Sequence, residues 1–116
     1  MGLFKKSNTN LPEFWKIYES QFKKPTSKNF DELTFVVLDT ETTGFSFDED
    51  RILSIGAVKI KKETISVQEV FEIYLEQEKF NKDSVNVHGL LKHGRRVCIS
   101  EISALEKFLD YVENSI

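Results

Sequence analysis

The feature that most constrains this chain of 116 residues is an apolar run, Leu33–Leu38, followed at once by the segment Asp-Thr-Glu-Thr-Thr-Gly at positions 39–44. A short apolar run of this kind predicts a buried β-strand. Side chains alternate between the two faces of a strand, so Asp39 and Glu41 should project from the same face where the strand ends. The sequence therefore predicts that two carboxylates converge at one place.

Such a pair of carboxylates is a candidate ligand set for a hard divalent cation. Mg²⁺ prefers oxygen ligands, commonly one or two carboxylates supplemented by water and substrate phosphate. Thr42, Thr43 and Gly44 suit a turn in which backbone and hydroxyl groups approach a ligand closely. A solvated turn is the more frequent role of acidic residues at a strand end, so the pair alone identifies no site.

The whole hexapeptide behind an apolar strand resembles the first motif of the DnaQ-like (DEDD) 3'-5' exonucleases, a family that includes the proofreading epsilon subunit of bacterial DNA polymerase III. Two further segments fit this resemblance in the right order. Residues 51–60 resemble the second strand of the family, including its Ile-Gly-Ala-Val core, and residues 87–90 are similar to its Val-His-Gly-Ile segment.

The resemblance implies an α/β, ribonuclease H-like exonuclease fold. This chain would carry its N-terminal portion, a three-stranded antiparallel meander plus flanking helices. The third strand is predicted from Thr64 to Leu75, after a turn at residues 61–63. We expect residues 1–32 to form an N-terminal helix and linker, and residues 33–116 to form the N-terminal part of the exonuclease domain.

Apolar residues at spacings of three and four predict two helices. Asn10 is the expected cap of the first helix, whose aromatic stripe consists of Phe14, Ile17, Tyr18 and Phe22. Ser100 or Ser103 is the expected cap of the second helix. The apolar face of that second helix is predicted to consist of Ile102, Leu105, Phe108, Leu109 and Val112.

By resemblance, catalysis and metal binding fall on Asp39 and Glu41. Asp39 would bridge two Mg²⁺ or Mn²⁺ ions, and Glu41 would hold the ion nearer the attacking water. Substrate binding is expected from four residues, Thr42 and Thr43 at the terminal sugar and Val87 and His88 beside the terminal nucleotide. An ordinary turn before Gly89 is an equal alternative for His88.

Two motifs of the family, which carry the remaining aspartates and the general-base histidine, are not found in this sequence. The resemblance therefore implies an incomplete domain that binds metal weakly and has little or no nuclease activity alone. A noncatalytic nucleic-acid or protein interaction module of the same fold is the alternative. A different metal phosphoesterase that shares only the Asp-x-Glu strand end is a third reading, against which the Ile-Gly-Ala-Val strand counts.

A second acidic cluster, Asp48, Glu49 and Asp50, follows the hexapeptide closely. Three consecutive charges cannot all face one ion, so we expect a solvated loop at this place.

Composition limits the partners and the compartment. A formal net charge of −3 argues against a generally basic nucleic-acid-binding surface. It still permits a nuclease in which bound metal cations contact the phosphates. The single cysteine, Cys98, excludes an intrachain disulfide and suits the cytoplasm, and no apolar stretch is long enough to span a membrane. The expected partners are a nucleic-acid 3' end, single-stranded DNA in preference to RNA, and a polymerase or other protein, with no membrane.

Overall fold

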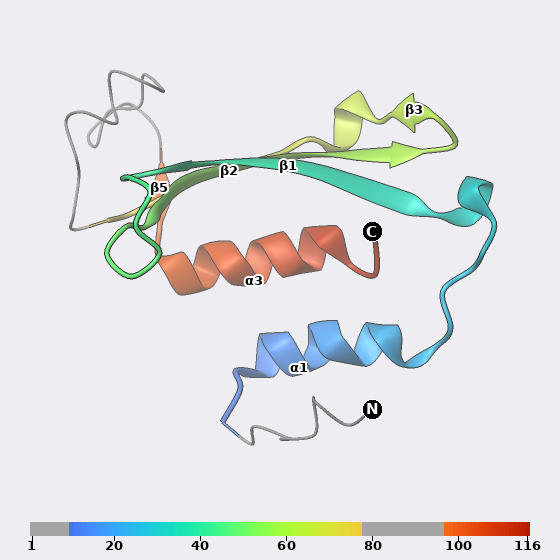
Figure 1. The fold of residues 1–116 in the computed structure, drawn as a ribbon, viewed down its shortest axis with the longest axis horizontal. Coiled ribbons are helices and arrows are strands. Elements are labelled where there is room, and N and C mark those ends of the chain that lie inside the picture. The colour runs from blue at the N-terminus through green and yellow to red at the C-terminus, as the bar shows by residue number, and fades with distance from the viewer. Residues whose placement is uncertain (1–9, 78–96) are drawn as a thin grey trace.

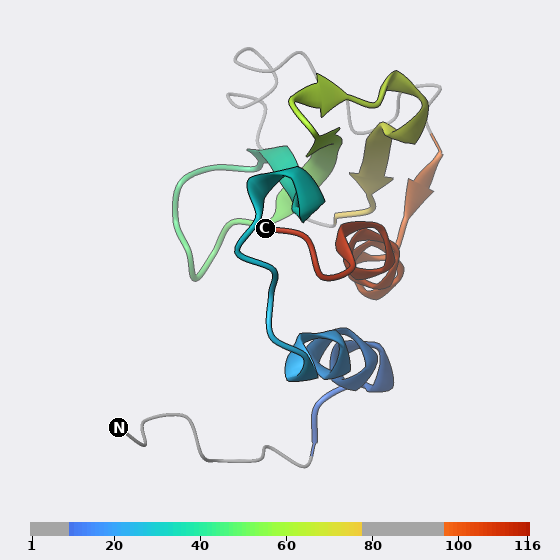
Figure 2. The ribbon, with the colours of Figure 1, turned by 90° about the vertical axis from the view of Figure 1, so that its right-hand side faces the viewer.

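A computed structural model describes residues 10–77 and 97–116 of the chain. Within these ranges, helix α3 (Glu101–Val112) covers one face of a mixed β-sheet, and helix α1 (Glu13–Ser20) packs on α3 from the outside (Figures 1 and 2). Both helices therefore lie on the same side of the sheet. In this described part of the chain, no helix has the length and apolarity needed to cross a bilayer.

The sheet is built on two long antiparallel strands, β1 (Thr34–Thr42) and β2 (Ile52–Lys61). Strand β4 (Phe71–Leu75) pairs antiparallel with the other edge of β2, and β5 (Cys98–Ile99) pairs parallel with β4. The order in space is therefore β1-β2-β4-β5, and the short β3 (Thr64–Ile65) also pairs with β2.

The prediction of one continuous third strand from Thr64 to Leu75 is wrong. The segment leaves the sheet after β3, forms the 3₁₀ turn η3 (Val67–Glu69) and returns as β4. The register gives the reason. From the pair Ile60↔Ile65 to the pair Ala57↔Phe71 there are three steps along β2 but six steps along the segment that joins β3 to β4. The three surplus residues have no partners on β2, so the chain bulges out as a turn.

The parallel strand β5 was not predicted, because two residues are too short for a periodic signal. Its pairing extends beyond β4, since the Glu76 N–H donates to the Ile99 carbonyl at 2.8 Å. β5 leads directly into α3, so this pairing sets the position from which α3 crosses the sheet.

The core lies between the sheet and α3. Alternate side chains of β2 and β4 point towards α3 and are buried, namely Leu53, Ile55, Ala57, Ile73 and Leu75. Ala104 of α3 is buried against them. The ring of Phe108 packs edge-on against Phe71 with centroids 5.7 Å apart. Buried apolar surface of this kind is the main stabilising contribution to such a small sheet.

Of the two predicted caps of helix α3, Ser100 occupies the N-cap position, and its hydroxyl oxygen accepts from the Ser103 N–H at 3.3 Å. Its predicted apolar face is wrong at Ile102, which is 67% exposed. The sheet-facing stripe is centred on Ala104, and a residue two positions earlier points about 200° away around the helix.

Helix α1 starts later than predicted. Pro12 rather than Asn10 occupies the N-cap position, and it has no side-chain capping bond. The helix tightens at its end into the 3₁₀ turn η1 (Gln21–Lys23). Along this segment the ring of Tyr18 contacts Trp15 and Phe22, with centroids 5.5 and 5.0 Å apart. The predicted stripe is not buried, since Ile17 and Phe22 are 55% and 46% exposed.

The 3₁₀ turn η2 (Phe30–Glu32) leads into β1, and the chain returns to the same place at its last residue. The Ile116 N–H donates to the Thr34 carbonyl at 2.9 Å, and the Val36 N–H donates to the Ile116 carbonyl at 2.7 Å. These two bonds form the pattern of a parallel bridge on the outer edge of β1.

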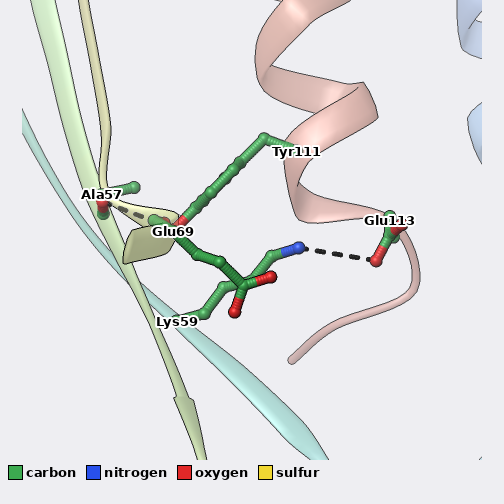
Figure 3. A network of polar contacts seen from close by, with 5 residues as sticks. All are labelled: Ala57, Lys59, Glu69, Tyr111 and Glu113. Carbon is green, nitrogen blue, oxygen red and sulfur yellow. Dashed lines mark hydrogen bonds and ion pairs between the residues drawn. The ribbon is translucent and has the colours of Figure 1, made fainter. Parts of the chain in front are cut away.

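The C-terminal turn of α3 is fastened to the sheet through Tyr111 (Figure 3). Its hydroxyl donates to the Glu69 carbonyl at 2.5 Å, and the Lys59 ammonium lies 4.7 Å from its ring centroid. The same ammonium lies 3.5 Å from the Glu113 carboxylate. Burial raises the pKa of the Tyr111 phenol above its ordinary value of 10.0, and the negative charge of Glu69 raises it further.

We expect Tyr111→Phe to lower the free energy of unfolding by about 1 kcal/mol at neutral pH, because one hydrogen bond is lost while the ring stays. A pKa raised by folding contributes stability that is fully present below 10.0 and is lost as the pH rises through the folded-state value. The difference between wild type and variant should therefore shrink above that pH in urea unfolding. Tyr18→Phe is the control, and a difference that is constant with pH would contradict the assignment.

Candidate active site

The two carboxylates singled out in the sequence both lie in β1, which continues through the acidic segment instead of ending before it. Asp39 pairs with Gly56 of β2, and Glu41 pairs with Ser54. Directly opposite residues of an antiparallel pair point to the same face, so Asp39, Glu41, Ser54 and Gly56 share the face opposite α3. The predicted convergence of the two carboxylates on one face is therefore present in the strand register.

The register of β1 and β2 shifts between Glu41 and Thr42, where Thr42 pairs with Ile52. Such a bulge bends the strand and changes the direction of the side chains beside it. The irregularity falls at the second carboxylate, where the strand leaves the sheet.

A shallow hollow of about 400 Å³ lies over this face of β1, β2 and β4. Its polar rim is formed by Asp39, Glu41, Ser54, Glu72 and Tyr74. Gly56 lies between Asp39 on β1 and Glu72 on β4, and a Cβ built on it would meet nothing within 4 Å. The absent side chain thus leaves space beside Asp39.

The threonines of the hexapeptide differ in their surroundings. Thr43 is buried, with 1% of its surface exposed. Its hydroxyl donates to the Asp50 carboxylate at 2.7 Å and accepts from the Arg51 N–H at 3.0 Å. The Thr42 hydroxyl donates to the Gly44 carbonyl at 2.7 Å, so both hydroxyls take part in holding the turn.

The loop after the hexapeptide is ordered by one of its acidic residues, which the sequence did not reveal. Asp50, predicted to be solvated with its neighbours, is half-buried, while Asp48 and Glu49 are exposed. Phe45 and Phe47 on the same loop are fully exposed, at 99% and 102% of their reference surfaces. In the sequence, the only signal for Asp50, Phe45 and Phe47 is that their loop directly follows the acidic segment.

The donor set suits a hard divalent cation, since Asp39 and Glu41 supply carboxylate oxygens beside open space that water can fill. Within residues 10–77 and 97–116, no three His, Cys, Asp or Glu side chains come together as a metal-binding group. Val87 and His88, the other predicted substrate residues, lie outside the described residues. The described part of the candidate site therefore consists of the carboxylates of Asp39 and Glu41 and of the turn that the hydroxyls of Thr42 and Thr43 hold.

Comparisons with known proteins show the family to which the chain belongs. The family model described as Exonuclease (RNase_T) matches residues 36–116, which run from β1 to the C-terminus and include the acidic segment. The chain is 36% identical over 88 residues to the DNA polymerase III PolC-type of Thermotoga petrophila and 36% identical over 87 residues to that of Thermotoga maritima. The protein therefore belongs to the DnaQ-like exonuclease family.

The match spans a small part of these relatives. The two Thermotoga alignments cover 76% and 75% of this chain but only 6% of each relative. A shorter alignment to the DNA polymerase III PolC-type of Staphylococcus haemolyticus is 50% identical over 38 residues, which is 33% of this chain and 3% of that protein.

Among solved structures, the crystal structure of cell-death related nuclease 4 (CRN-4) has a TM-score of 0.59 with 20% sequence identity. The superposition covers 72% of this chain and 30% of that chain. A likeness at this identity shows the fold, and it confirms the predicted α/β, ribonuclease H-like class.

The two glycines of the site should respond oppositely to the same substitution. Gly56→Ala should raise the free energy of unfolding by about 0.5–1 kcal/mol, because the methyl group enters open space and the strand loses an entropically costly glycine. A Cβ on Gly44 would lie 2.5 Å from Oδ2 of Asp50, so Gly44→Ala should lower it by about 1–3 kcal/mol. Urea unfolding of both variants gives the comparison, and equal signs would contradict the described geometry.

Proposed function

We propose that this protein contributes the first part of the active site of a 3'-5' exonuclease, which hydrolyses the terminal phosphodiester at a nucleic-acid 3' end. The observation that carries the proposal is the shared face of Asp39 and Glu41 beside the hollow over Gly56. Membership of the exonuclease family supports it, since the family match includes this strand.

In this proposal Asp39 and Glu41 would hold the metal ions, and Glu41 would also orient the terminal 3'-hydroxyl. Mg²⁺ or Mn²⁺ bound there would lower the pKa of the attacking water and stabilise the leaving oxygen. The backbone of both residues is held by pairing with β2, which fixes the face of the sheet to which they belong.

The proposed substrate-binding residues are Thr42, Thr43, Val87 and His88. Because Thr43 is only 1% exposed and its hydroxyl already has two partners, we assign it an indirect part, which is to hold the turn that carries Thr42. Thr42 retains acceptor capacity for the sugar, since a hydroxyl oxygen has two lone pairs and its one described bond uses the proton.

The proposed substrate is a 3' end of single-stranded DNA, in preference to RNA. The relatives are named as DNA polymerases, which supports a DNA substrate and a polymerase as protein partner. Base stacking on exposed aromatic rings suits unpaired nucleotides, and Phe45 and Phe47 provide such rings near the site.

Two carboxylates leave most positions around two metal ions to water or to other groups. We therefore propose that ligands beyond the described residues complete the site, and that the 116-residue chain alone binds metal weakly and releases few or no mononucleotides. The same observation favours a second candidate, a noncatalytic module of this fold, because the described residues hold no third ligand.

The test is fluorescence anisotropy with a labelled single-stranded oligodeoxynucleotide that ends in either a 3'-hydroxyl or a 3'-phosphate. We expect Mn²⁺ to strengthen binding of the 3'-hydroxyl form, and Asp39→Asn to weaken it by at least about tenfold, because metal affinity depends on this ligand. Asp110→Asn, an exposed carboxylate on α3, is the matched control.

Binding that is indifferent to Mn²⁺, to the 3' end and to Asp39→Asn would favour the noncatalytic module instead. A ribonucleotide version of the same oligomer tests the proposed preference for DNA. Release of 5'-mononucleotides by the purified chain would contradict the expected inactivity of the chain alone, and its loss in Asp39→Asn would assign that activity to this site.

A further inference from the structure

The loop that follows the acidic segment is closed by a single carboxylate. Oδ1 of Asp50 accepts from the Thr43 hydroxyl at 2.7 Å, and Oδ2 accepts from the Ser46 N–H at 2.8 Å. The Asp50 N–H donates in turn to the Ser46 carbonyl at 2.9 Å. One side chain thus ties both halves of the loop together.

The base of this loop is closed by a second set of bonds through Thr43. Its N–H donates to the Arg51 carbonyl at 2.9 Å, and its hydroxyl accepts from the Arg51 N–H at 3.0 Å. Thr43 is buried and follows Glu41 by two residues, so the base of the loop is continuous with the strand end that carries the carboxylate.

Gly44 fits against the same carboxylate. All three nearest atoms to a Cβ built there belong to Asp50, at 2.5 to 2.8 Å. A glycine is therefore required for the carboxylate to reach Thr43 and Ser46, and the two residues act as one structural unit.

The neighbouring acids do not share this role. Asp48 and Glu49 are exposed, and within residues 10–77 and 97–116 they form no hydrogen bond or ion pair. Of three consecutive acidic residues, only Asp50 is directed into the loop, so a specific geometry rather than general negative charge explains its position.

We propose that Asp50 is a positioning residue for the substrate 3' end: its carboxylate, acting through Thr43 and Gly44, holds the turn beside Glu41 in the conformation that receives the terminal nucleotide. This inference rests on the proposed function and adds to it a residue that touches neither metal nor substrate. Groups held rigidly before binding avoid the ordering cost that a flexible loop pays when its ligand arrives.

The chemistry of the carboxylate explains why an amide does not replace it. A carboxylate accepts on both oxygens, and hydrogen bonds to a charged acceptor are stronger than neutral ones. The amide of Asn accepts only on its oxygen. With that oxygen on the Ser46 N–H, its NH₂ group faces the Thr43 hydroxyl, which would have to accept instead of donate. Asp50→Asn should therefore keep the shape of the side chain and weaken its two hydrogen bonds, because the charged acceptor is lost.

The experiment compares binding of the 3'-hydroxyl and 3'-phosphate oligodeoxynucleotides in Mn²⁺ at a temperature at which every variant is folded. For Asp50→Ala we expect affinity for the 3'-hydroxyl form to fall by roughly tenfold and the preference over the 3'-phosphate form to disappear. Asp50→Asn should fall between wild type and Asp50→Ala, and Asp48→Asn on the same loop should bind as wild type does.

Gly44→Ala displaces the carboxylate without removing it, so it should reproduce the binding defect of Asp50→Ala. In the Asp50→Ala background the added methyl group meets no carboxylate, and Gly44→Ala should then have little further effect. If the Asp50 carboxylate served only stability, these variants would have lower unfolding midpoints, but the folded proteins would keep the preference for a 3'-hydroxyl. That result would overturn the inference.

Failure of the proposed function gives a different result. If the wild-type chain itself shows no Mn²⁺-dependent preference for a 3'-hydroxyl, the proposed function is wrong for this chain and the inference is overturned with it. If the wild type shows the preference and Asp50→Ala retains it in full, only the positioning role of Asp50 is overturned.

Discussion

The antiparallel register of β1 on β2 is the constraint on which the rest of this structure depends. It places Asp39 opposite Gly56 and Glu41 opposite Ser54, so both carboxylates lie on the face away from α3. A slip of one residue would turn them towards the core, because side chains alternate along a strand. The burial of Ile55 and Ala57 on the other face therefore also fixes where the carboxylates point.

The sequence predicts this part of the molecule well, because strand periodicity is a local property. The shared face of Asp39 and Glu41, the cap at Ser100 and the fold class all follow from patterns within a few residues or from the family resemblance. The break between β3 and β4 depends on the count of residues across β2, and the role of Asp50 depends on Thr43, seven positions away. Such pairings are set by the folded chain, so no local pattern reports them.

The two faces of the sheet have different functions in this account. Helix α3, fastened at one end by the β5 pairing and at the other by Tyr111, covers one face and provides the buried core. The other face carries the carboxylates and the hollow over Gly56. Helix α1 precedes the region that the exonuclease family model matches, and it contacts α3 on the side away from the sheet (Figure 1). Stability and the proposed chemistry are thus separated across one sheet.

The measurement that tests the central claim most directly is line broadening by Mn²⁺ in the amide NMR spectrum of this chain. The paramagnetic ion broadens signals of nearby residues, so the account predicts losses centred on Asp39 to Glu41 and on Gly56 across the strand. These losses should disappear in Asp39→Asn. Broadening centred on Asp48 and Glu49 instead, or broadening that Asp39→Asn leaves unchanged, would contradict the assignment of a metal site to β1.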